Sequence, residues 1–267
     1  MLHPKADSHD LYAFLSVWER KVNVFLHGQR AGCRLEYVDA ANLKIKSGDI
    51  WFPGGLRRNL DDLTITMGTD MVDGVSEAAD TWYYVYARPH KTNPERWEAI
   101  FDTTAPDAGG TGRHPTEDWV YLGAVRNNNS SNLVSFDQAG RRFYWRDIVL
   151  SGTWGGLPVG PGPCGTLVPP NMLGLFEQEI RLDSTSAVEG MFSLYTTAAG
   201  SGTTASALRF WADAGSSERQ FEFAVCAADG SGQVGVYARV TAGTYTPGGV
   251  AVQLWSVGWV DPFLPAG

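Results

Sequence analysis

Much of the chain alternates hydrophobic and polar positions with a period of two, and this pattern predicts short antiparallel β-strands with one wet face. In the first part of the chain the alternating runs are Leu35–Tyr37, Leu43–Ile45, Ile50–Phe52 and Leu63–Met67. Turns rich in glycine and proline, such as Pro53-Gly54-Gly55, separate the runs. The pattern therefore predicts a mainly β protein.

The stretch from Thr81 to Trp145 is the densest in aromatic and β-branched residues. In Trp82–Ala87 both faces of the predicted strand are bulky, so we expect it to be central in its sheet and covered on both sides. Further strands are predicted over residues 97–101, 119–125, 133–136 and 142–145, and a long polar loop over residues 105–118.

A different period occurs near the N-terminus, where residues 7–27 are predicted to form a helix. Its apolar positions follow the spacing of an a/d seam over two heptads and are Leu11, Leu15, Trp18, Val22 and Phe25. Such a stripe either packs on its own domain or joins three subunits in a short coiled coil. Residues 1–32 are therefore predicted to be a helical segment for oligomerisation or attachment.

Residues 148–176 contain no charged side chain, and they include five prolines among many glycines. A membrane helix does not tolerate that density of helix breakers, so an extended connector is expected over residues 149–164. Alternation then resumes, with strands predicted over residues 176–182, 191–196, 208–212, 221–227, 234–240 and 250–259. Six strands with this spacing predict a β-sandwich or jelly roll over residues 165–267. A first antiparallel domain of the same sandwich-like or jelly-roll-like kind is expected over residues 33–148.

Composition excludes several classes of partner and site. The formal net charge of the 267 residues is −8, which argues against a nucleic-acid partner because phosphate binding needs a basic face. The three cysteines, Cys33, Cys164 and Cys226, are far apart and fit buried free thiols better than a disulfide framework or a zinc site. The polar N-terminus lacks the apolar core of a signal peptide, and no membrane insertion is expected.

No reactive constellation stands out. The sequence has no HExxH, GxSxG or phosphate-binding loop, so no catalytic residue, metal ligand or cofactor is predicted. Neighbouring acids such as Asp61-Asp62 and Glu117-Asp118 lie in apparent turns, and in a strand their side chains would point to opposite faces. The chain is therefore not expected to be an enzyme.

Sugar binding is the more plausible chemistry, since lectin-like sites stack a sugar ring on an exposed aromatic side chain and add polar hydrogen bonds. The candidate contacts are Trp154, Trp211, Asp213 and His114, the last in the 105–118 loop. Trp211 and Trp255 lie in apparent strands beside apolar neighbours, which favours core packing for both. Trp154 is flanked by a glycine and is expected to be exposed or to fill a subunit contact.

The motifs of residues 82–145 resemble a module of tailed-bacteriophage tail fibres, tailspikes and baseplate proteins. They are WYYVYA at 82–87, IFDTTAP at 100–106, WVYLGAVR at 119–126 and LVSFDQAGRRFYW at 133–145. The resemblance covers residues 33–148 and brings no catalytic position with it. It implies a β-rich virion protein, made in the host cytoplasm, that acts as a homotrimer with other virion proteins.

The resemblance leaves three functions open. The first is host-surface attachment, through loops of the β domains that bind a cell-surface glycan. The second is a purely structural adaptor, collar or head-decoration protein that contacts only other virion proteins. The third is a glycan-cleaving tailspike, which requires two carboxylates that face one cleft.

Overall fold

The computed structural model describes residues 30–107, 112–155, 159–184, 186–196, 204–243 and 251–264. The helix predicted over residues 7–27, with its seam of Leu11, Leu15, Trp18, Val22 and Phe25, lies outside these ranges. The described residues form a mainly β protein, as predicted, and divide into two compact units, Met1–Val134 and Ser135–Gly267.

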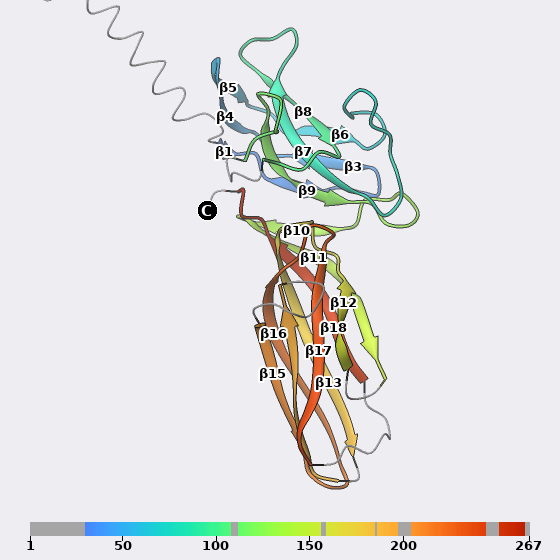
Figure 1. Cartoon of the computed structure of the whole chain (residues 1–267). Coiled ribbons are helices and arrows are strands. Elements are labelled where there is room, and N and C mark those ends of the chain that lie inside the picture. Colours follow the sequence, from blue (N-terminus) through green and yellow to red (C-terminus); the bar gives the residue numbers. More distant parts are fainter. Residues whose placement is uncertain are drawn as a thin grey trace, which may run out of the picture. The chain divides into compact units, whose positions relative to one another are not determined.

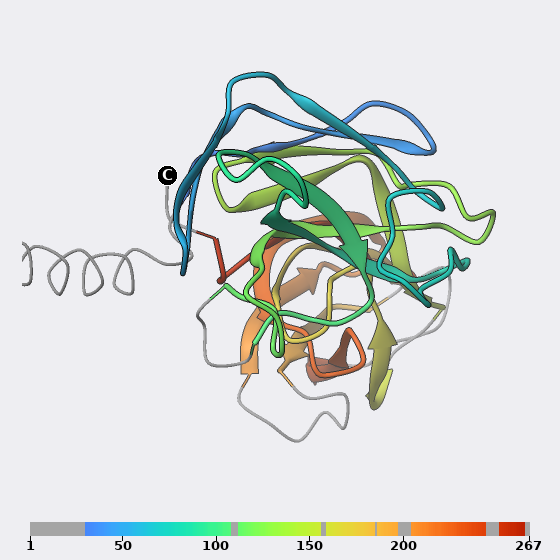
Figure 2. The same ribbon diagram turned by 90° about the horizontal axis from the view of Figure 1, so that it is seen from above.

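The N-terminal unit is built from three small antiparallel sheets (Figure 1). The first contains β1 (Arg30–Gly32), β4 (Gly48–Phe52) and β5 (Gly55–Asn59), and the second contains β2 (Leu35–Tyr37), β3 (Asn42–Ile45) and β6 (Leu63–Thr66). The third contains β8 (Trp97–Asp102), β7 (Trp82–Pro89) and β9 (Val120–Arg126), in that order. Its strands thus fall into three separate three-stranded sheets and run in several directions (Figure 2), so this unit is not the two-layered sandwich that was expected.

Strand β7 is the centre of the third sheet, between β8 and β9, as its two bulky faces predicted. Residues Tyr83–Ala87 are all buried, and the hydroxyls of Tyr83 and Tyr86 still find partners. Tyr83 accepts a hydrogen bond from the backbone N–H of Ala78 (2.6 Å), and Tyr86 donates to the carbonyl of Thr104 (2.9 Å). The aromatic core is stable because its polar ends are satisfied.

The C-terminal unit is a two-sheet sandwich (Figure 1). One sheet has the order β10 (Phe136–Ala139), β11 (Arg142–Trp154), β18 (Ala251–Val260), β13 (Leu173–Ser184) and β16 (Ser216–Ala227). The other has the order β12 (Val159–Gly165), β17 (Gln233–Gly243), β14 (Val188–Tyr195) and β15 (Thr204–Ala212). The six strands predicted between residues 176 and 259 are all present.

The strand pairs are nested: β14 pairs with β15, β13 with β16, β12 with β17 and β11 with β18, all antiparallel. This nesting is that of one long hairpin rolled up so that its strands alternate between two sheets, which is the jelly-roll arrangement. The chain thus closes a sandwich whose first and last long strands, β11 and β18, lie side by side.

The predicted boundaries need correction. The first unit ends at Val134, not at residue 148, because β10 and β11 pair with each other and β11 pairs with β18 of the jelly roll. The expected connector over residues 149–164 is instead the end of β11 and most of β12. Strand β12 tolerates Pro163 because it is the edge strand of its sheet, where a missing N–H breaks no ladder.

Three aromatic rings close the end of the sandwich where β10, β11 and β18 meet. The ring centroids of Phe143 and Trp259 lie 4.6 Å apart with an interplanar angle of 4°, and the ring centroid of Trp145 lies 4.7 Å from that of Trp259.

The three cysteines are free and buried, as predicted.

Candidate functional site

The outer face of the four-stranded sheet carries an exposed tryptophan beside a depression. Trp211 of β15 is 61% exposed and lies directly across from Glu189 of β14 in the strand register. Its neighbours in sequence, Phe210 and Ala212, are buried. Because side chains alternate between faces, the burial of these two turns the indole toward solvent.

Two glycines allow close packing under this face. A Cβ atom on Gly190 would lie 2.0 Å from Cζ of Phe210, so only glycine at this inward-facing position of β14 leaves room for the phenylalanine ring. Gly243 has a φ of +80°, and a Cβ there would lie 2.1 Å from the carbonyl oxygen of Ala187. Only glycine permits this close approach of β17 to the start of β14.

The depression has two adjoining parts that share Glu189 and Trp211. The larger part has a volume of about 480 Å³, and its lining includes Met191, Arg209, Arg239 and Thr241. The smaller part has a volume of about 240 Å³, and its lining includes Ala187, Asp213, Ala242 and Gly243. The indole of Trp211 therefore borders both parts. Small residues and Asp213 line the smaller part, and the two arginines line the larger one.

Charges of both signs surround the indole. Arg209 and Arg239 flank Met191 on the two neighbouring strands, while Glu189 and Asp213 lie at the other end. Within the described ranges neither guanidinium group forms an ion pair. The site thus offers donors, acceptors and an aromatic face together, the combination that binds a polyhydroxylated ring.

Glu189 and Asp213 are the two carboxylates of this site. Both side chains are exposed to solvent. A glycosidase holds its proton-donating carboxylic acid in an apolar enclosure, and neither residue has one. The arrangement supports hydrogen bonding to a sugar better than proton transfer to it.

The structure brings two of the four predicted sugar contacts together, Trp211 and Asp213. Trp211 is exposed and not in the core, contrary to the expectation for it. Trp154 is half-buried on β11, where its ring lies 6.1 Å from the buried ring of Phe192, so it is not an exposed platform. Trp255 is half-buried on the outer face of the other sheet and does not fill the core either.

His114 is not available as a sugar contact, which corrects the prediction. Its Nε2 donates to Oδ2 of Asp102 at 3.1 Å, and the two side chains are only 7% and 5% exposed. Its Nδ1 accepts the backbone N–H groups of Thr116 (3.3 Å) and Glu117 (3.2 Å). The imidazole also contacts the rings of both Tyr86 and Trp119, and so holds the 112–119 segment against the third sheet.

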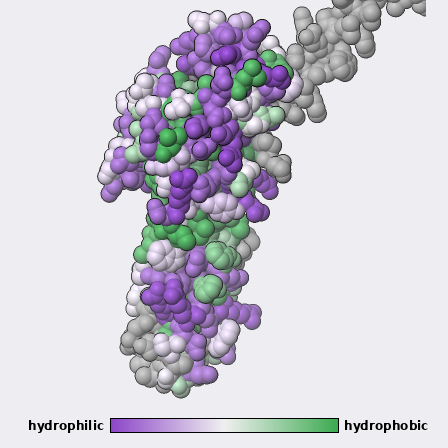
Figure 3. Space-filling view, turned by 180° about the vertical axis from the view of Figure 1, so that it is seen from behind, coloured by the Kyte–Doolittle hydropathy of each residue, from purple (hydrophilic) through white to green (hydrophobic). Residues whose placement is uncertain are grey.

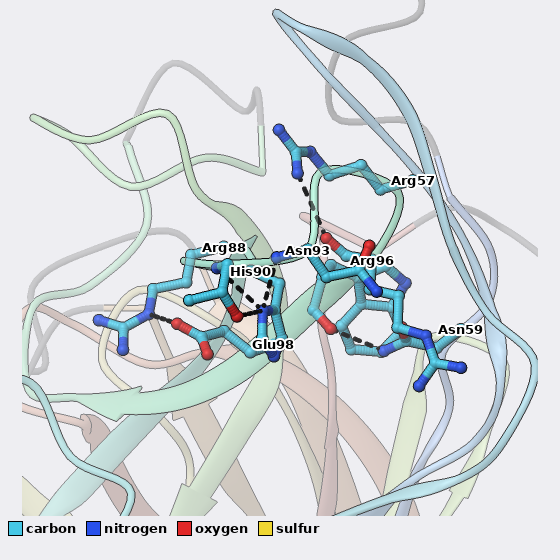
Figure 4. Close-up of polar contacts among 9 residues, drawn as sticks. Arg57, Asn59, Arg88, His90, Asn93, Arg96 and Glu98 are labelled. Atoms are coloured by element: carbon cyan, nitrogen blue, oxygen red, sulfur yellow. Dashed lines mark hydrogen bonds and ion pairs between the residues drawn. The ribbon is translucent and has the colours of Figure 1, made fainter.

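His90 forms the same kind of turn at the β7–β8 connection (Figure 4). Its Nδ1 accepts the backbone N–H groups of Thr92 and Asn93, both at 3.2 Å. Nearby, Arg88 pairs with Glu98 at 2.7 Å, and Asn59 donates to the carbonyl of Trp97 at 2.8 Å. These contacts fasten strands to one another within the N-terminal unit.

Sequence reasoning missed Glu189, Arg209 and Arg239. Each lies on the solvent side of an alternating strand, where charged residues are ordinary, so the sequence holds no signal that separates them from other surface charges. Their common location depends on which strands pair. The described ranges contain no cluster of three potential metal ligands and no helix long and apolar enough to cross a membrane.

No family model and no curated protein matches the chain. Among solved structures, an isomalto-dextranase of Arthrobacter globiformis T6 complexed with panose is 11% identical, over 83% of this chain and 35% of that one, with a TM-score of 0.24. The structure of infectious bursal disease virus, Gx strain, is 10% identical, over 85% of this chain and 65% of that one, with a TM-score of 0.25. The chain spans about a third of the length of the first. TM-scores of this size carry no argument about function.

Proposed function

We propose that this chain is a structural protein of a tailed-phage virion and that its jelly roll binds a host-surface glycan at the Trp211 depression. The observation that carries the binding site is the exposed indole, which borders a depression with carboxylates at one end and guanidinium groups at the other. The virion assignment rests on the motifs of residues 82–145. A jelly roll is used by both capsid and lectin domains, so the fold is compatible with either role.

The mechanism is adhesion by stacking and hydrogen bonding. A sugar ring would lie on the Trp211 face, while Glu189 and Asp213 accept hydroxyl protons and Arg209 donates to ring or carboxyl oxygens. One such site is weak by itself, but several copies on one virion raise avidity without new contacts.

Binding should be measured with purified protein on a glycan array, followed by calorimetry with a monovalent oligosaccharide from the array. Trp211→Ala should weaken binding about fivefold, since loss of an aromatic stack is worth about 1 kcal/mol and each 1.4 kcal/mol is a factor of ten in affinity. Trp211→Phe should retain part of the affinity. Phe221→Ala removes an aromatic side chain of similar exposure from the other sheet and should leave the affinity unchanged.

Two results would redirect the proposal. If no glycan binds, the adaptor role, with only virion proteins as partners, replaces adhesion. If the protein releases sugar from host polysaccharide and Glu189→Gln or Asp213→Asn abolishes the release, the carboxylates act chemically and the chain is a glycan-cleaving enzyme.

A further inference from the structure

Three strands of the four-stranded sheet line up two arginines across one methionine. The register places Arg209 of β15 and Arg239 of β17 directly beside Met191 of the intervening strand β14. The arginine side chains lie on the outer face, because Leu208 and Ala238, which precede them in sequence, are buried. Since neighbouring strands are about 4.8 Å apart, the Cα atoms of the two arginines are about 10 Å from each other, and both side chains can reach one group above Met191.

The place of the two arginines distinguishes them from other surface charges. Hydrophilic and hydrophobic residues are mixed over the surface in Figure 3, so an exposed arginine is ordinary by itself. Arg209 and Arg239, however, border the same depression of about 480 Å³, and neither forms an ion pair with a carboxylate within the described ranges. By contrast, Arg181 and Arg219 of the other sheet share the carboxylate of Glu179. The two positive charges of the depression are therefore open to an anionic ligand.

The larger part of the depression is locally positive on an acidic protein. Its charged lining residues are Arg209, Arg239 and Glu189, two positive groups to one negative, whereas the whole chain has a formal net charge of −8. A guanidinium group presents a planar set of N–H donors that fits the paired oxygens of a carboxylate or a phosphate. Met191 is apolar and half-buried between the arginines, and an apolar floor strengthens their attraction for an anion.

We propose that the sugar bound at the Trp211 depression is an acidic one, with its anionic group above Met191 and between Arg209 and Arg239. The proposal rests on the function proposed above and names the class of sugar, one that carries a carboxylate or a phosphate ester. Trp211 lies two residues from Arg209 on β15, about 6.6 Å along the strand, so the edge of a ring stacked on the indole is within reach of the guanidinium group. Asp213 borders the indole from the smaller part of the depression, where it repels the anion and accepts hydroxyl protons, so the sugar has one favoured orientation.

The first arm of the test compares sugars that differ in charge, with the full chain. Three matched pairs are added to the glycan array: trigalacturonate and its methyl ester, sialyllactose and its methyl ester, and lactose phosphate and lactose. The array should show binding to acidic glycans, and in calorimetry the acidic member of a bound pair should exceed its neutral partner in affinity at least about tenfold, because it adds charge-assisted hydrogen bonds. The pair with the larger difference distinguishes a carboxylate from a phosphate ester.

The second arm removes the charges of the protein one at a time. Arg209→Gln and Arg239→Gln should each weaken binding of the acidic member about fivefold, as for a partly exposed ion pair, and should leave any binding of its neutral partner unchanged. Arg142→Gln is the matched control, because Arg142 is an exposed arginine of β11 in the other sheet and has no ion pair among the described residues. Circular dichroism verifies that each variant folds.

The outcomes separate this proposal from the one on which it rests. If neutral glycans bind as tightly as acidic ones and Trp211→Ala weakens them, the glycan site stands and its acidic specificity is overturned. The same holds if Arg209→Gln and Arg239→Gln bind the acidic member as the Arg142→Gln control does. If the array binds no glycan of any kind, both proposals fail together.

Discussion

The His114 clamp permits a sharp prediction, because the chain contains the same turn twice. In both turns Nδ1 of a histidine accepts two backbone N–H groups, at residues 116 and 117 for His114 and at residues 92 and 93 for His90. Only His114 adds a buried partner, the carboxylate of Asp102 at 3.1 Å. Replacing each histidine by alanine separates the value of the turn from the value of the buried pair.

The magnitudes follow from burial. His90→Ala removes an acceptor in a solvent-exposed turn, where water replaces it, and should cost about 1 kcal/mol, as for a lost helix cap. His114→Ala removes the same acceptor and opens a space beside Trp119; among the described residues it leaves Asp102 the N–H of Thr104 (3.0 Å) as a donor. Leaving a buried carboxylate without one of its hydrogen-bond donors costs about 1–3 kcal/mol. The two variants should therefore differ by about 1–3 kcal/mol.

Urea unfolding followed by tryptophan fluorescence measures both variants. Since Trp119 lies 4.9 Å from the His114 ring, the transition of the N-terminal unit should be the one that shifts. The double variant Asp102→Ala/His114→Ala should cost less than the sum of the single changes, because it leaves no carboxylate stranded. If His114→Ala costs no more than His90→Ala, the buried pair contributes nothing and the reasoning fails.

Two further predictions concern buried ionisable groups. Burial alone would raise the pKa of Glu179, but the hydrogen bonds from Arg181 and Arg219 together outweigh burial and lower it. The stabilisation from this carboxylate is therefore present above the ordinary glutamate pKa and is lost as pH falls through the pKa of the folded state. The gap in urea midpoint between wild type and Glu179→Gln should then shrink from pH 6 to pH 3; a constant gap contradicts this. Burial raises the pKa of the Cys33 thiol to about 12 and the pKa values of the Cys164 and Cys226 thiols to about 11. Because the thiolate is the reactive form, a disulfide reagent at pH 8 should label none of the three until urea unfolds the protein. Rapid labelling of the folded protein would refute this prediction.

The period-two pattern predicted many of the strands, though not β1, β5 or β12, and also predicted that β7 is a central one. Residues 82–87 are bulky on both faces, and no packing other than a central position hides both. The same pattern located the six strands from β13 to β18, since each keeps its alternation over most of its length. These properties are local, so the sequence alone is sufficient for them.

The functional face was not predictable in this way. Phe210 and Trp211 are adjacent aromatic residues, and alternation says only that they point to opposite sides, not which side is the core. Gly190 decides it, because its missing Cβ leaves room for Phe210, and it lies on another strand. The place of Trp211, exposed beside Glu189, follows from that choice.

What the sequence by itself determined is a mainly β chain with buried free thiols and no recognisable reactive motif. Only the tertiary structure decided that β11 closes on β18, that residues 149–164 belong to strands, and that Trp211 meets Glu189 and Asp213. The physical reason is that alternation fixes the two faces of a strand but not its partner. Partners are chosen by long-range packing, which here nests residues 142–260 into a jelly roll and brings β11 beside β18.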